Sequence, residues 1–190
     1  MQTSLEILKA YYLYPVLIHF PVALLSLYVG FELIRFKVLM NNSWWFFVKA
    51  ALVLFGTFFQ LLTTISFYFF SMNIVNPKTP IQFVKIIHTY ELYMIITLVV
   101  FMILSVGYKV SFIDKNLIFM NLKNTKFWNF FRVISREVLN SYVTIILATT
   151  GFFALLVASS IGSYINYGGN ITDPVTYGVM NMVMPGNQIR

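Results

Sequence analysis

Cysteine is absent from this chain of 190 residues, and charged residues are scarce at 10% of the total. The absence of cysteine excludes disulfides, thiolate metal sites and a cysteine nucleophile. A soluble domain usually carries about 25% charged residues, so this chain cannot cover a globular surface with polar side chains. A glycine-rich loop ending in Lys-Ser or Lys-Thr is also missing, which excludes a nucleotide-binding P-loop. The remaining composition, 59% hydrophobic with 20 Phe and 12 Tyr, predicts an integral membrane protein.

Four apolar segments are each long enough for the roughly 20 residues that cross a bilayer as a helix. They run from about residue 11 to 34, 44 to 70, 86 to 108 and 142 to 165. The runs are continuous and lack period-two alternation, which favours helices over barrel strands. We therefore expect an all-α bundle of four transmembrane helices over residues 1–165, followed by a C-terminal loop extension over residues 166–190.

The connection between the third and fourth segments has a pattern of its own. Apolar residues recur in it at helical spacing, and basic residues lie between them; the apolar set is Phe127, Phe130, Phe131, Ile134 and Val138. This pattern predicts an interfacial amphipathic helix on a lipid-contacting face.

The formal net charge of +7 comes from Lys and Arg residues that lie between the apolar runs. We interpret them as topology determinants beside an anionic membrane surface, and we expect no nucleic-acid partner. One side of the predicted bundle carries Arg35, Lys37, Lys109, Lys115, Lys123, Lys126, Arg132 and Arg136, and the other carries Lys9, Lys78, Lys85 and Arg190. The positive-inside rule then places both termini outside.

His19 and His88 are the only histidines in the chain. His19 lies within the first segment and His88 near the start of the third, and these two segments run in the same direction across the membrane. Two histidines on facing helices at similar depth are what axial ligation of a b-type haem requires, so haem b near the outer face is the first of three interpretations. With Glu91, one turn after His88, the pair could instead hold a non-haem metal. In the third interpretation each histidine only forms hydrogen bonds.

Other polar residues within the segments predict helix contacts. Glu32 and Lys49 lie at the inner ends of the first two segments, where an ion pair would join the helices; a proton-relay carboxylate is the alternative for Glu32. Interhelical hydrogen bonds are expected from Gln60, Thr63 and Thr64. Close helix packing is expected from a small-residue stripe in the fourth segment, Thr150, Ala154, Ala158 and Gly162.

The stretch Tyr14–Leu25, YPVLIHFPVALL, resembles the opening signature of domain-of-unknown-function family 2231, which comprises predicted four-helix bacterial membrane proteins. That signature has His-Pro followed by His-Phe-Pro-Ile-Ala-Leu. The later stretch Gly162–Gly169, GSYINYGG, is similar to the family's Gly-Gly-x-x-x-Tyr motif, and His88 matches a histidine early in its third helix. Tyr14 and Ser163 replace a histidine and a glycine of the family pattern, so no role of that first histidine is carried over.

The association of some family members with c-type cytochromes implies electron transfer. Our first hypothesis is a membrane subunit of a respiratory-type assembly in a bacterial inner membrane; an organelle inner membrane would suit the same composition. It would hold haem b through His19 and His88, contact other membrane subunits, and exchange electrons with a soluble cytochrome or quinol without being an enzyme on its own. The alternative hypothesis is an accessory or structural subunit without a cofactor. A transporter is disfavoured because the sequence shows neither inverted repeats nor broken helices.

Overall fold

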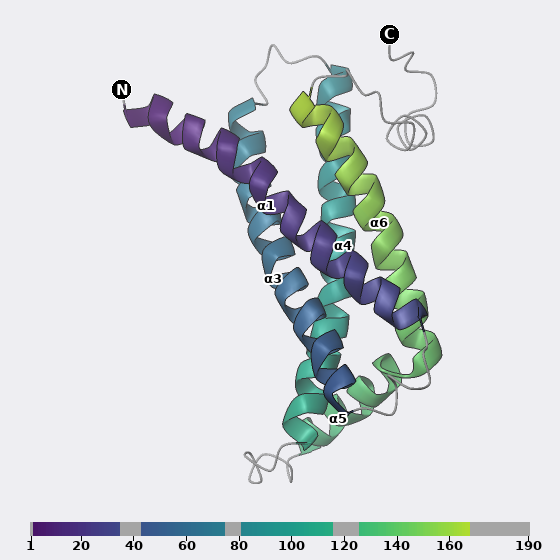
Figure 1. The fold of residues 1–190 in the computed structure, drawn as a ribbon. Helices are drawn as coiled ribbons and strands as arrows, with labels where there is room; N and C mark the ends of the chain where they lie inside the picture. Colours follow the sequence, from purple (N-terminus) through teal and green to yellow (C-terminus); the bar gives the residue numbers. More distant parts are fainter. Residues whose placement is uncertain (1, 35–42, 75–80, 116–125, 168–190) are drawn as a thin grey trace.

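The computed structural model describes residues 2–34, 43–74, 81–115 and 126–167, with the side chains of residues 2–16 left undescribed. These residues form five helices and no strand (Figure 1). The helices are α1 (Gln2–Leu33), α3 (Ser43–Ile74), α4 (Ile81–Lys115), α5 (Lys126–Val138) and α6 (Ser141–Tyr167). The all-α prediction is confirmed for the described part of the chain, whereas most of the predicted extension 166–190 lies outside it.

Three of the helices are long and apolar enough to cross a membrane. The candidate spans are Trp44–Met72 in α3, Phe83–Asp114 in α4 and Ser141–Ile165 in α6. In α1 the apolar stretch among the described side chains is shorter, Leu17–Leu33. The second, third and fourth predicted spans are thus confirmed in length and composition, and the first span remains a prediction.

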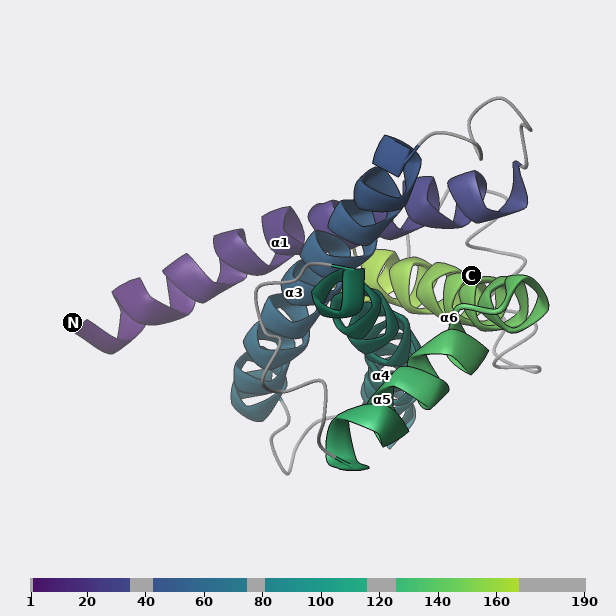
Figure 2. The same cartoon turned by 90° about the horizontal axis from the view of Figure 1, so that it is seen from below.

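The backbones of the long helices are not all adjacent to one another. α1 packs against α3 and α6, while α4 packs against α3, α5 and α6. α1 runs obliquely to the other long helices, and its N-terminal half extends away from them (Figures 1 and 2). Among the described residues the backbones of α1 and α4 are not adjacent, and the two helices meet only through side chains in the bundle interior. The first and third predicted helices are therefore not the backbone neighbours that the haem prediction assumed.

The predicted amphipathic helix is present as α5, which lies across the end of the bundle where α4 finishes and α6 begins (Figure 2). Its one buried residue is Ser135, whose hydroxyl donates a hydrogen bond to the Gly107 carbonyl oxygen of α4 at 2.7 Å. Phe127 and Phe130 remain exposed. A helix with an exposed aromatic side and basic residues suits the lipid–water interface.

The bundle interior contains two clusters of apolar side chains, together with polar side chains that form hydrogen bonds between helices. Gln60 Nε2 contacts Met94 Sδ at 3.3 Å, and the Thr63 hydroxyl donates to the Leu17 carbonyl oxygen at 3.2 Å. These two contacts confirm the predicted interhelical bonds of Gln60 and Thr63. For Thr64 the prediction is wrong, because its hydroxyl donates within its own helix to the Gln60 carbonyl oxygen. A hydroxyl on α3 or α4 can always reach the carbonyl one turn earlier, so composition alone does not identify the acceptor.

Close helix contacts depend on glycine. A Cβ at Gly56 of α3 would lie 2.5 Å from the Leu25 side chain of α1. A Cβ at Gly151 of α6 would lie 2.8 Å from the ring of Phe101 in α4, which is fully buried. The predicted stripe on α6 is buried at Ala154, Ala158 and Gly162, whereas Thr150 is exposed. Small residues therefore bring α1, α3, α4 and α6 together, as expected for membrane helices.

Candidate functional site

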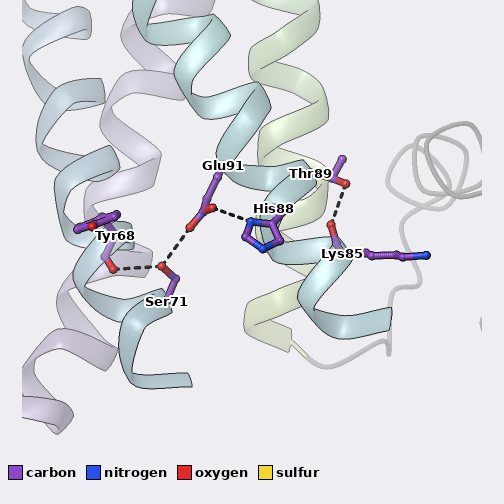
Figure 3. A network of polar contacts seen from close by, with 6 residues as sticks. All are labelled: Tyr68, Ser71, Lys85, His88, Thr89 and Glu91. Carbon is purple, nitrogen blue, oxygen red and sulfur yellow. Dashed lines mark hydrogen bonds and ion pairs between the residues drawn. The ribbon is translucent and has the colours of Figure 1, made fainter. Parts of the chain in front are cut away.

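The end of the bundle where α3 ends and α4 begins, which the sequence predicts to be the outer end, carries a short network of polar contacts. His88 and Glu91 lie one turn apart on α4, with Nδ1 and Oε2 3.2 Å apart (Figure 3). The Ser71 hydroxyl of α3 donates to Glu91 Oε1 at 3.1 Å and also reaches the Tyr68 carbonyl oxygen. A spacing of three residues puts both side chains on one helix face, and Ser71 extends the contact to the next helix. The contacts among His88, Glu91 and Ser71 therefore join α3 to α4 near the surface.

The two histidines do not meet inside the bundle. The side chain of His88 is 72% exposed, and His19 is also exposed. The space between their helices is filled by one buried apolar cluster that includes Ile18, Ile87 and Tyr90. Because the neighbours of the histidines close this interior, the arrangement does not fit a haem held between His19 and His88 within one chain.

The non-haem alternative finds no support either. His88 and Glu91 form a pair on α4, whereas His19 lies on α1, whose backbone is not adjacent to that of α4. No group of three or more His, Asp, Glu or Cys residues that could hold a metal ion occurs among the described residues. Metal and haem roles for His19, His88 and Glu91 remain predictions.

The opposite end of the bundle, where α1 ends and α3 begins, holds a more deeply buried polar cluster. Lys49 Nζ of α3 lies 2.9 Å from Glu32 Oε1 of α1, and the Tyr108 hydroxyl of α4 donates to the same oxygen at 2.6 Å. Glu32 is only 6% exposed, so its charge is compensated almost entirely by these two groups. The predicted ion pair between the first two helices is confirmed.

Tyr108 is the member that sequence reasoning missed. Tyrosines at the ends of apolar segments usually mark the membrane interface, so the residue type by itself does not indicate a buried acid partner. Tyr28 and Phe46 pack against its ring with centroids 6.0 and 5.3 Å away. The hydroxyl of Tyr28 is buried and makes no hydrogen bond of standard geometry with any described residue. Three helices, α1, α3 and α4, therefore meet in this aromatic and polar cluster.

A cavity of about 350 Å³ opens beside this cluster. Its lining includes Glu32, Lys49 and Tyr108, the aromatic Trp45, and hydroxyls from Ser111 and Thr144. The cavity is thus bounded by α1, α3, α4 and α6 and offers one anion, one cation and several hydroxyls. Glu32, Lys49 and Tyr108 are paired with one another, so this end of the bundle is best suited to joining helices.

Comparison of the chain with protein-family models, curated proteins and solved structures finds no match. The resemblance to domain-of-unknown-function family 2231 therefore stays a prediction. What the chain does must be argued from its own surfaces.

Proposed function

We propose that this chain is a four-span accessory subunit of a larger membrane protein assembly, and that the uncovered face of α1 contacts a partner helix. The observation that carries this proposal is the exposed imidazole of His19 on an apolar helix. If the first span begins near residue 11, His19 lies about 12 Å inside it, at about 1.5 Å per residue. A polar side chain that faces lipid at that depth loses its water and gains no other hydrogen-bond partner.

The residues around His19 support a helix as the occupant of this face. Ala23, Ser26 and Gly30 follow His19 at intervals of four, three and four residues, so the set shares one side of α1. Ala23 is exposed, and a Cβ placed at Gly30 would meet no atom of the described residues within 4 Å. Small residues on an open side of a membrane helix allow a second backbone to approach closely, and a nearby polar group can then hydrogen-bond across the contact.

The basic residues support the topology that this proposal requires. Lys49, Lys109, Arg132 and Arg136 lie at the end where α5 crosses the bundle, and Lys85 lies at the other end. The excess at the α5 end favours an inner location for α5 and outer locations for both termini. A respiratory-type electron-transfer assembly remains the context that the family resemblance implies, without a haem in this chain.

Site-directed photocrosslinking in native membranes tests the proposal. A photoreactive amino acid at Ala23 should give a protein adduct of one defined mass, and the same probe at Phe55, a 61% exposed residue of α3, serves as the control. Purification in a mild detergent should then yield the crosslinked partner in stoichiometric amount. Labelling of lipid alone at Ala23, together with migration as a lone monomer, would contradict the proposal.

An absorbance spectrum of the same preparation separates the two hypotheses. We expect no Soret band, because His19 and His88 do not share an interior space. A Soret band that disappears in both His19→Ala and His88→Ala variants would restore the haem hypothesis and displace the accessory-subunit proposal.

A further inference from the structure

A groove runs between α4 and α5 on the side of the bundle away from α1. Its volume is about 310 Å³, at the lower end of the range of about 300–1,000 Å³ found for ligand sites. Apolar side chains line it almost throughout, with Met102, Ile103 and Val106 on α4 and Phe131 and Ile134 on α5.

The groove lies beside a close contact between α4 and the C-terminal part of α5. Gly107 has no side chain, and a Cβ there would lie 3.3 Å from Val138 and 3.5 Å from Leu139. The hydrogen bond from Ser135 to the Gly107 carbonyl oxygen fixes this approach at 2.7 Å. Beside this contact, the apolar side chains of Met102, Ile103 and Ile134 stay 41–43% exposed.

A second, polar cavity of about 220 Å³ adjoins the groove, since Val110 and Ser135 line both. It contains the guanidinium groups of Arg132 and Arg136 and the carboxylate of Asp114. Arg132 donates to Asn129 at 3.0 Å and lies 3.9 Å from Asp114. Arg136 is exposed and makes no ion pair with any residue that the structure describes. Two guanidinium groups against one carboxylate leave an excess of positive charge.

We infer that this pair of cavities binds one anionic phospholipid of the inner leaflet, with an acyl chain in the α4–α5 groove and the phosphate between Arg132 and Arg136. Charge complementarity selects this occupant, because guanidinium groups bind phosphate oxygens in a bidentate manner. The groove is apolar and ends at two arginines. It therefore matches a lipid that has an apolar acyl chain and an anionic head group. The inner leaflet is also the one that carries anionic lipids. The inference is independent of the proposed partner on α1.

Native mass spectrometry of the full chain in detergent tests the inference. Phosphatidylglycerol and phosphatidylcholine with identical acyl chains are titrated separately, and we expect a preference for phosphatidylglycerol. The double variant Arg132→Gln/Arg136→Gln should lower that preference about tenfold, as expected for the loss of charge-assisted hydrogen bonds. The matched control Lys109→Gln/Lys126→Gln removes the same charge from exposed positions of α4 and α5 that line neither cavity, and should leave the preference unchanged.

A groove variant distinguishes a lipid from a free anion. Val106→Trp fills the groove from a position that is 42% exposed, so it should weaken phosphatidylglycerol binding while helical content by circular dichroism stays unchanged. Glycerol phosphate, which has the head-group charge without acyl chains, should not compete. Equal losses in the arginine and lysine double variants, equal binding of the two lipids, or effective competition by glycerol phosphate would each overturn the inference.

Discussion

Breaking the Glu32–Lys49 pair from either side should destabilise the bundle, whereas removing both charges together should not. The side chains of Glu32 and Lys49 are 8% and 20% exposed, so each depends on the other for compensation of its charge. Removal of one partner from a buried pair costs about 3–5 kcal/mol, because it leaves an uncompensated charge. Replacement of both by neutral side chains of similar volume is often nearly neutral.

The two single variants should differ in a way that the structure specifies. Lys49→Met leaves the more buried carboxylate with only the Tyr108 hydroxyl, so we expect a loss of about 3 kcal/mol in unfolding free energy. Glu32→Gln leaves Lys49, whose flexible stem can carry the ammonium toward water, so the loss should be smaller, about 2 kcal/mol. The unfolding free energy of the double variant Glu32→Gln/Lys49→Met should stay within about 1 kcal/mol of the parent value. The coupling energy between the two residues is then about 4 kcal/mol.

Unfolding by sodium dodecyl sulfate in mixed micelles, followed by far-ultraviolet circular dichroism, measures these differences. Lys85→Met is the matched control, because Lys85 is exposed and its side chain points away from the helices around it (Figure 3). We expect it to change the unfolding free energy by less than about 0.5 kcal/mol. If the losses of unfolding free energy in the two single variants simply add in the double variant, Glu32 and Lys49 are not coupled and do not compensate each other's charge.

Further outcomes follow from the packing. Gly151→Ala should lower the unfolding free energy by about 2 kcal/mol, because the added methyl group would lie 2.8 Å from a buried ring, while the control Gly30→Ala should be neutral or stabilising by up to about 1 kcal/mol. Equal effects of the two alanines in the same micelle assay would contradict the packing. Ser135→Ala should cost about 1 kcal/mol and speed amide hydrogen exchange across α5, and unchanged exchange would show that this bond does not hold α5. Glu91→Gln should change stability by less than about 0.5 kcal/mol, since its partner His88 is 72% exposed; a loss above about 1 kcal/mol would show that the His88–Glu91 ion pair, despite its exposure, stabilises the bundle.

Hydropathy predicted α3, α4 and α6 correctly because the length and apolarity of a span depend on local composition. The same reasoning predicted α5, whose spacing of aromatic and basic residues is also local. The ion pair of Glu32 and Lys49 could be predicted from the sequence, because two opposite charges at one end of consecutive helices have few other partners within the membrane. Local composition and the costs of burial in lipid together account for these successes.

The contacts between helices could not be predicted in the same way. In a segment that is apolar all round, periodicity does not identify the buried side, and the order of four helices around a bundle has several solutions. His19 and His88 were expected on facing helices, but the backbone of α1 is adjacent to α3 and α6 and meets α4 only through side chains. Tyr108 was missed for the converse reason, because only the packing of α4 against α3 and α6 brings its hydroxyl to Glu32.

The described glycines separate contacts within the chain from a surface that faces outward. A glycine in a helix interior lowers the stability of the helix by about 1 kcal/mol relative to alanine. Close packing against another helix at the glycine offsets that loss. Gly56, Gly107, Gly151 and Gly162 each have side-chain atoms of another segment within 4 Å of the position a Cβ would occupy. Gly30 has none within that distance, although it lies in the same apolar stretch as His19. A partner helix against this side of α1 would give Gly30 the close contact that the other four glycines have within the chain. The same contact would cover the imidazole of His19, so one surface accounts for two features that the bundle by itself leaves unexplained.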